Sequence, residues 1–172
     1  VIIVTGSTSG IGIGIAKLCA KEGAKVVVCG RRAEKGQVVV DQIKKEGGEA
    51  VFHFFDITKL ETIESLIKDT YEMFGHIDVL INNAANVALK DGRVDELTVE
   101  MWDAIFESDM RGTFYATKTV LPYLEKNEKG GSIINIGSMA STNGDLSSTA
   151  YACAKAGVDM LTLSTALQYG KK

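Results

Sequence analysis

The sequence predicts an α/β fold in which a doubly wound parallel sheet carries helices on both faces. Short apolar runs rich in β-branched residues alternate along the chain with longer segments of helical period, and the linkers between them are short. The chain has 172 residues, of which 45% are hydrophobic, so it can bury one sizeable core but is short for two domains. We therefore expect a single domain over residues 1–172.

The first strand, turn and helix predict a phosphate-binding unit. Residues 1–4 are apolar and mostly β-branched, as in a buried strand, and a glycine-rich segment leads from them into a helical pattern. Gly6 would let the chain turn sharply, Gly10 would let backbone N–H groups approach a pyrophosphate, and Gly12 would let the helix pack closely on the sheet. A second strand at 25–29 completes the unit and predicts dinucleotide binding at the helix N-terminus. The alternative phosphate loop needs a Gly-Lys-Ser/Thr ending, which this sequence lacks.

The remaining elements follow the same alternation. After the second strand we expect, in order, a helix at 34–46, a strand at 50–57, a helix at 59–74, a strand at 78–85, a helix at 99–126, a strand at 131–138 and a helix at 151–169, with a helix end at 169–172. Thr98 can cap the long central helix, and Pro122 should bend or shorten its final turns. This alternation predicts parallel strands joined by right-handed crossovers.

Small and polar residues stand where the expected strands end. Gly6, Asp56, Asn82 and Ser138 all fall at carboxyl ends of strands. In an open parallel sheet a ligand binds beyond these ends, near the point where the strand order reverses. The sequence therefore predicts the ligand site at this edge of the sheet.

Composition excludes several classes of function. A net charge of −3 offers no basic field for nucleic acid or an anionic membrane, and no apolar run approaches the ~20 residues of a spanning helix. The chain begins inside a strand and carries no recognisable signal peptide. The three scattered cysteines, Cys19, Cys29 and Cys153, suit reduced thiols in a cytoplasmic protein. His53 and His76 have no acidic or cysteine partners at ligand spacing, so we expect no metal site.

Tyr151 and Lys155 suggest carbonyl chemistry. They lie four residues apart in YACAKAG, on one face of the expected helix, and Ser138 stands thirteen residues upstream. A phenol has a reference pKa of about 10, and a neighbouring ammonium group favours the phenolate. Taken alone the spacing better fits a solvated surface pair, and Ser138 alone better fits a cap at a strand end.

Together these motifs resemble the short-chain dehydrogenase/reductase family, in the branch with a TGxxxGxG motif and a Tyr-x-x-x-Lys pair. The matching segments are TGSTSGIG at 5–12, DIT at 56–58, NNAA at 82–85, Ser138, and YACAK at 151–155, in the family's order and spacing. The resemblance covers essentially the whole chain. It implies a Rossmann-like fold and an NAD(P)-dependent oxidoreductase that moves hydride between a nicotinamide and a ketone or secondary alcohol.

The resemblance also assigns cofactor-binding residues. They are Gly6, Ser7, Thr8, Ser9, Gly10, Ile11, Gly12, Asp56, Ile57, Asn83, Ala84, Ala85, Tyr151 and Lys155. Asp56 and Ile57 would hold the adenine, and Asn83 would steady the central sheet. As a helix-initiating residue Asp56 also has an ordinary structural interpretation.

The catalytic roles come from the same resemblance. Ser138 would position the substrate oxygen, Tyr151 would transfer the proton, and Lys155 would bind the nicotinamide ribose as well as act on Tyr151. The family further implies a homo-oligomer, a dimer or tetramer, formed through the long helices.

Cofactor choice can be argued from the end of the second strand. NAD enzymes usually place an acidic residue about 20 residues beyond the glycines, whereas this chain has Arg31 and Arg32 there. A guanidinium group can make paired hydrogen bonds to a phosphate, so Arg31, with Arg32 second, predicts a preference for NADP. NAD stays possible, because the two arginines also fit a solvated loop pair.

The chain departs from the family's pattern at two places. Asp109 in SDMRGTF stands where the family usually has an asparagine that holds a water of the proton relay, and Ala85 replaces a glycine. If that role depends mainly on a backbone carbonyl at a helix kink, Asp109 could substitute. If it needs the side-chain amide, Asp109 lowers activity, which leaves a weakly catalytic nucleotide-binding or scaffold protein as the alternative. The family also continues beyond residue 172 with two strands and a substrate-covering lobe, so we expect the sequence to be truncated and substrate specificity to lie outside it.

Overall fold

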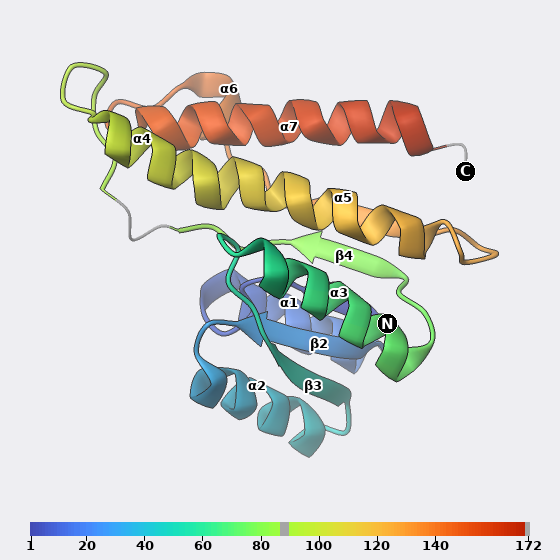
Figure 1. Cartoon of the computed structure of the whole chain (residues 1–172). Coiled ribbons are helices and arrows are strands. Elements are labelled where there is room, and N and C mark those ends of the chain that lie inside the picture. The colour runs from blue at the N-terminus through green and yellow to red at the C-terminus, as the bar shows by residue number, and fades with distance from the viewer. Residues whose placement is uncertain (87–89, 171–172) are drawn as a thin grey trace.

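The fold is a parallel sheet between two layers of helices, seen in a computed structural model that describes residues 1–86 and 90–170 (Figure 1). Within these residues the strands are β1 (Ile2–Val4), β2 (Lys25–Gly30), β3 (Glu49–Phe54), β4 (Val79–Asn82) and β5 (Ser132–Asn135). They pair in the order β3-β2-β1-β4-β5, and every pairing is parallel. The strand order thus reverses at β1, the point at which a doubly wound sheet binds its ligand. The predicted fold class is confirmed.

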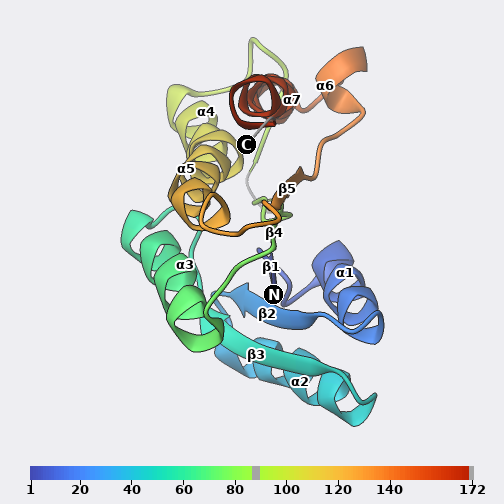
Figure 2. The same ribbon diagram turned by 90° about the vertical axis from the view of Figure 1, so that its right-hand side faces the viewer.

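Helices cover both faces of the sheet (Figure 2). The helices are α1 (Gly10–Lys21), α2 (Ala33–Lys45), α3 (Leu60–Phe74), α4 (Val99–Phe106), α5 (Gly112–Leu124), α6 (Ala140–Asn143) and α7 (Thr149–Tyr169). A π-helical turn, η1 (Glu107–Arg111), joins α4 to α5 in one continuous rod, and α7 runs along that rod (Figure 1). The end of the predicted C-terminal helix at 171–172 lies outside the described residues.

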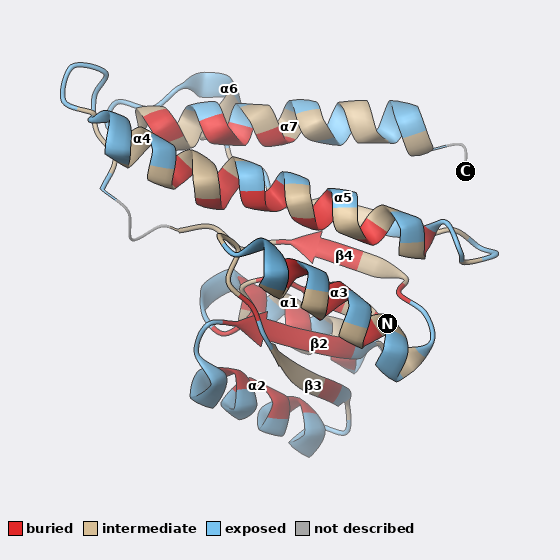
Figure 3. Cartoon of the chain, in the orientation of Figure 1, coloured by how far each residue is buried: buried red, intermediate tan, exposed pale blue. Residues whose placement is uncertain are grey.

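The core is divided by the sheet. One cluster packs Ile3, Val27 and Leu80 of the strands against α3 and α5, and a second packs Val26 and Val28 against α1 and α2. Successive residues of β2 point to opposite faces, yet both faces are covered, and β2 is red along most of its length in Figure 3. Burial on both faces explains why the strands are continuously apolar in sequence instead of alternating.

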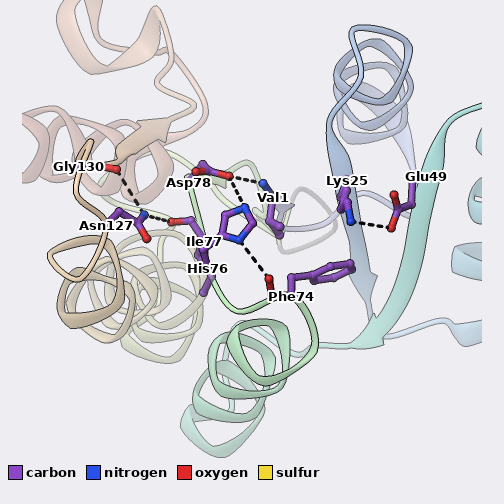
Figure 4. A network of polar contacts seen from close by, with 9 residues as sticks. All are labelled: Val1, Lys25, Glu49, Phe74, His76, Ile77, Asp78, Asn127 and Gly130. Carbon is purple, nitrogen blue, oxygen red and sulfur yellow. Dashed lines mark hydrogen bonds and ion pairs between the residues drawn. The ribbon is translucent and has the colours of Figure 1, made fainter.

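At the amino-terminal edge of the sheet, polar contacts join the loops that precede the strands (Figure 4). The side-chain amide of Asn127 donates to the carbonyl oxygens of Ile77 (2.6 Å) and Gly130 (3.3 Å), and Nε2 of His76 lies 3.3 Å from Oδ2 of Asp78. These contacts hold the edge opposite the predicted ligand site.

The central helix differs from its prediction in two respects, its end and a π-turn within it. Thr98 caps it as expected, because its Oγ1 accepts from the N–H of Met101 at 3.3 Å. The rod ends at Leu124 rather than residue 126, which agrees with a shortening effect of Pro122. The π-turn η1 was not predicted, because the shift from i−4 to i−5 hydrogen bonds leaves no pattern in composition.

Candidate active site

A cleft of about 410 Å³ lies at the carboxyl ends of the strands. The predicted residues that line it are Gly6, Thr8, Ser9, Gly10, Ile11, Arg31, Arg32, Asp56, Ile57, Asn83, Ala84, Ala85, Tyr151 and Lys155. Gly30, Phe55, Thr58, Asn86, Ile136 and Gly137 also line it and were not predicted. The cleft therefore combines the glycine loop, the strand ends and the first turns of α7, which are far apart in sequence.

The glycine loop has the backbone geometry of an anion site. Gly6 and Gly10 have φ values of 66° and 56°, the left-handed region that glycine adopts without strain. A side chain at Gly6 would also approach Cα of Ala84 to 2.9 Å, whereas the space beside Gly10 is open to at least 4 Å. Ser9 makes no side-chain cap to α1, and the first turn of α1 has no acidic residue. The N–H groups of this turn are thus free of a side-chain cap, as binding of a phosphate requires.

Thr5 and Asn83 lock the ends of β1 and β4 together. The buried Oγ1 of Thr5 accepts hydrogen bonds from the N–H groups of Asn83 (2.9 Å) and Ala84 (3.0 Å). The side-chain amide of Asn83 donates to the carbonyl oxygen of Thr5 at 2.9 Å. A Cβ at Gly12 would lie 2.7 Å from that amide nitrogen, so the glycine lets α1 approach the junction. Thr5 is the first residue of the glycine motif, but the sequence alone gave its side chain no role.

Two residues of the predicted cofactor set are not among those that line the cleft. Ser7 is buried, and its Oγ donates to the carbonyl oxygen of Val4 (2.7 Å) and accepts from the N–H of Cys29 (2.9 Å). Gly12 is buried within α1. The side chain of Ser7 therefore joins β1 to β2. The neighbouring Cys29 thiol is buried as well, and burial raises its pKa far above the ordinary range.

The end of β2 places two arginines at the cleft. Arg31 and Arg32 follow Gly30 directly, and both are exposed. Among the residues that the structure describes, neither guanidinium group has a hydrogen bond or an ion pair. Asp56, just after the neighbouring strand β3, is engaged by its own loop, because its Oδ1 accepts from the N–H (3.0 Å) and hydroxyl (2.9 Å) of Thr58. The arginines are thus available to an anionic ligand.

Tyr151 and Lys155 lie together near the N-terminus of α7. Nζ of Lys155 donates to the carbonyl oxygen of Ile136 at 2.8 Å and lies 5.7 Å from the centroid of the Tyr151 ring. Burial lowers the pKa of the Lys155 ammonium group, and the carboxylates of Asp109 and Asp159 partly offset this by raising it. The hydroxyl of Tyr151 makes no hydrogen bond within the described part of the chain. An ammonium group thus faces a phenol that is free to meet a ligand.

Asp109 lies behind this pair, in the π-turn η1. It is buried, and its Oδ1 accepts from the N–H of Asn86 (2.9 Å) and from the hydroxyl of Ser108 (2.6 Å). Its backbone carbonyl accepts from Oγ1 of Thr113 at 3.0 Å. Asp109 is not among the residues that line the cleft, but its carboxylate raises the pKa of Lys155 and it binds the backbone N–H of Asn86, which does line the cleft.

Ser138 lies just past β5, beside the cleft-lining Gly137, but does not itself line the cleft. Its Oγ accepts from the N–H of Ala140 at 3.2 Å, which is the cap geometry that the sequence left open as an alternative. For its hydroxyl hydrogen no acceptor is seen in residues 1–86 and 90–170. The cap therefore leaves the serine able to donate to a ligand.

Within the described residues, no helix combines the length and apolar character needed to cross a bilayer, and no group of three or more His, Cys, Asp or Glu side chains could hold a metal ion. Cys19, Cys29 and Cys153 are all free.

Comparison with known proteins agrees with this geometry. A family model described as "short chain dehydrogenase" matches residues 1–172. The chain is 38% identical to the 7alpha-hydroxysteroid dehydrogenase of Clostridium sardiniense, over 100% of this chain and 66% of that protein. An actinorhodin polyketide ketoreductase variant, solved with NADPH, superposes with a TM-score of 0.90 at 35% identity, over 97% of this chain and 64% of that one. A metagenomic short-chain oxidoreductase in complex with NADP gives a TM-score of 0.91 at 31% identity, over 99% of this chain and 75% of that one.

The chain therefore belongs to the short-chain dehydrogenase family, as its motifs predicted. It spans 61% to 68% of the length of the curated relatives that it matches.

Proposed function

We propose that residues 1–172 form the dinucleotide-binding domain of an NADP-dependent oxidoreductase that acts on a ketone or secondary alcohol. One observation carries the proposal: a phenol and an ammonium group share a cleft with a helix N-terminus that has no side-chain cap. The names of the relatives, a hydroxysteroid dehydrogenase and a polyketide ketoreductase, support a substrate with a hydroxyl or keto group.

The residues present fit a dinucleotide. The open space beside Gly10 and the uncapped N-terminus of α1 suit a pyrophosphate, and Arg31 with Arg32 suit the 2′-phosphate of NADP. Asp56 and Ile57 line the same cleft and would contact the adenine. Two of the similar solved structures hold NADPH or NADP, which supports NADP over NAD.

The protein's part in the reaction is to stabilise and neutralise a developing oxyanion. NADPH, when bound, supplies hydride to the ketone carbon. Tyr151 then delivers its hydroxyl proton to the ketone oxygen, while the Ser138 hydroxyl donates a hydrogen bond to that oxygen and orients it. In the opposite direction Tyr151 removes the proton of an alcohol.

Lys155 would serve both the phenol and the cofactor. One N–H of its ammonium group is used by the carbonyl oxygen of Ile136, which leaves two for the ribose hydroxyls. Its positive charge stabilises the phenolate that Tyr151 becomes when it gives up its proton.

A weakly catalytic nucleotide-binding or scaffold protein is the second candidate, and Asp109 is the observation that favours it. Its buried carboxylate stands where the family's pattern has an amide, and the added charge acts on Lys155.

The Tyr151→Phe variant separates the two candidates. Stopped-flow loss of NADPH absorbance is followed with a panel of ketones, and NADPH binding is measured in parallel. We expect the rate constant for hydride transfer to fall about 10²–10⁴-fold, the usual contribution of general acid catalysis, with NADPH affinity retained. Equal rates in wild type and variant would refute the catalytic proposal.

Assembly and location belong to the same proposal. Exposed apolar side chains gather on α7, at Met160, Leu163 and Leu167, and α5 exposes Phe114. They support a homodimer or homotetramer in which these helices meet. The free cysteines favour a reducing compartment such as the cytoplasm.

A further inference from the structure

The helix that carries Tyr151 has no cap of its own. The first N–H groups of any helix lack partners within the helix and need them from elsewhere. Ser148 stands at the N-cap of α7, but its side chain makes no cap hydrogen bond, and the first turn contains no acidic residue. The first backbone hydrogen bond of the helix runs from the N–H of Ala152 to the carbonyl oxygen of Ser148.

The missing partners come from a loop about sixty residues upstream in sequence. Oδ2 of Asp91 accepts from the N–H of Tyr151 at 2.8 Å, and Oδ1 accepts from the N–H of Ala150 at 3.2 Å. The carbonyl of Gly92 accepts from the N–H of Thr149 at 3.3 Å, and the N–H of Gly92 returns to Oδ1 of Asp91 at 2.8 Å. Three consecutive N–H groups of α7 are thus held by Asp91 and Gly92.

Few other hydrogen bonds hold the turn of α7 that carries Tyr151. Two ties hold α7 to the end of β5, from Lys155 to the carbonyl of Ile136 and from the side-chain amide of Asn135 to Oγ1 of Thr162. Both lie downstream of Tyr151, which occupies the terminal turn, and helix ends fray first. Ala150 and the ring of Tyr151 also pack in the cluster around Ile105, but this packing gives the N–H groups of the turn no hydrogen-bond partner. A carboxylate at this end also interacts favourably with the helix dipole.

We propose that Asp91 is a positioning residue for Tyr151, an inference that rests on the proposed function. Asp91 is not among the residues that line the cleft. It fixes the backbone N–H of Tyr151 and so sets where the phenol stands relative to the ketone oxygen. A displacement of about 1 Å at a reacting group can cost about 100-fold in rate, so a cap outside the cleft can control catalysis.

The test compares Asp91→Ala, Asp91→Asn and the control Asp95→Ala in the hydride-transfer assay at saturating NADPH, well below the melting temperature. Asp95 lies on the same loop, and among the described residues its carboxylate is paired only with Arg93, at the surface. We expect Asp91→Ala to lower kcat about tenfold or more with the Kd for NADPH within about twofold. Asp91→Asn keeps one oxygen acceptor for two N–H groups and should restore part of the rate, and Asp95→Ala should match wild type.

An Asp91→Ala variant that loses stability but keeps the wild-type kcat would overturn the positioning role, because a purely structural cap moves only the melting temperature. If Asp91→Ala does not fold, Asp91→Asn decides: a reduced kcat with NADPH binding intact supports the role, and an unchanged kcat overturns it. A wild-type protein that reduces no ketone would overturn the proposed function and this inference together, whereas an active wild type with equally active Asp91 variants overturns this inference alone.

Discussion

Adding one methyl group at Gly12 should disturb the cofactor site, whereas the same methyl at Gly14 should not. Both glycines lie in α1, two residues apart. A Cβ at Gly12 would lie 2.7 Å from Nδ2 of Asn83, 2.7 Å from the carbonyl oxygen of Gly6 and 2.8 Å from Cα of Ser7. A Cβ at Gly14 would meet nothing within 4 Å.

The magnitudes follow from these contacts. Two of the three atoms that Gly12→Ala meets are backbone, and the third belongs to the amide that binds Thr5, so relief requires the loop or α1 to move. Overpacking of this kind costs about 1–3 kcal/mol. Gly14→Ala should instead stabilise the protein by about 0.4–1 kcal/mol, because alanine loses less backbone entropy in a helix. For a chain of this size, each kcal/mol corresponds to a shift in melting temperature of about 2–4 °C.

Thermal unfolding and NADPH titration of both variants test the reasoning. We expect Gly12→Ala to melt below wild type and to bind NADPH more weakly, because the shifted atoms include those of the glycine loop. Gly14→Ala should melt at or above wild type with unchanged affinity. Equal melting temperatures and equal affinities for the two variants would show that α1 does not depend on close approach at Gly12.

Two further substitutions test the charges of the site. Asp109→Asn removes a carboxylate that raises the pKa of Lys155, so the pKa of Lys155 should fall further below its ordinary value. Because the ammonium group then loses its proton at a lower pH, the alkaline limb of the pH profile of kcat/KM should move to lower pH. Superimposable profiles of wild type and variant would show that the charge at this position is immaterial. Arg31→Ala should lower the ratio of kcat/KM for NADPH to kcat/KM for NADH about tenfold, since an exposed charge-assisted hydrogen bond contributes about 1.5 kcal/mol. Arg32→Ala should lower this ratio less. An unaltered ratio in Arg31→Ala would refute the assignment of the phosphate to Arg31.

The order of strands and helices could be predicted because burial on both faces leaves continuous apolar runs. The ends of the strands were less predictable. The run expected to form a strand at 50–57 leaves the ladder after Phe54, yet Phe55 is buried in the core beside α3, so its apolar character reports packing and not strand pairing. An apolar pattern alone does not distinguish the two.

The candidate site was predictable where its residues form a local motif. The glycine loop, the NNAA segment and the Tyr-x-x-x-Lys pair are such motifs, and most of their residues line one cleft. Ser7 belongs to the same glycine motif, but its side chain points into the protein and binds the backbone of β1 and β2. The spacing of the motif does not show which of its side chains points inward. Asp91 was missed because it meets α7 only in three dimensions, from a loop with no pattern of its own.

The π-turn at Glu107–Arg111 lets a single rod serve two different partners. An extra residue in one turn rotates everything beyond it by about 100° around the axis. Ile105, ahead of the turn, packs with Ala150 and Ala154 of α7, whereas Ala116 and Val120, beyond it, pack into the core with the sheet and α3. Deleting one residue from the turn would rotate α4 relative to α5, so that the two helices could no longer face both partners at once. The length of this short segment therefore fixes how α7, which carries Tyr151, packs on the rest of the molecule.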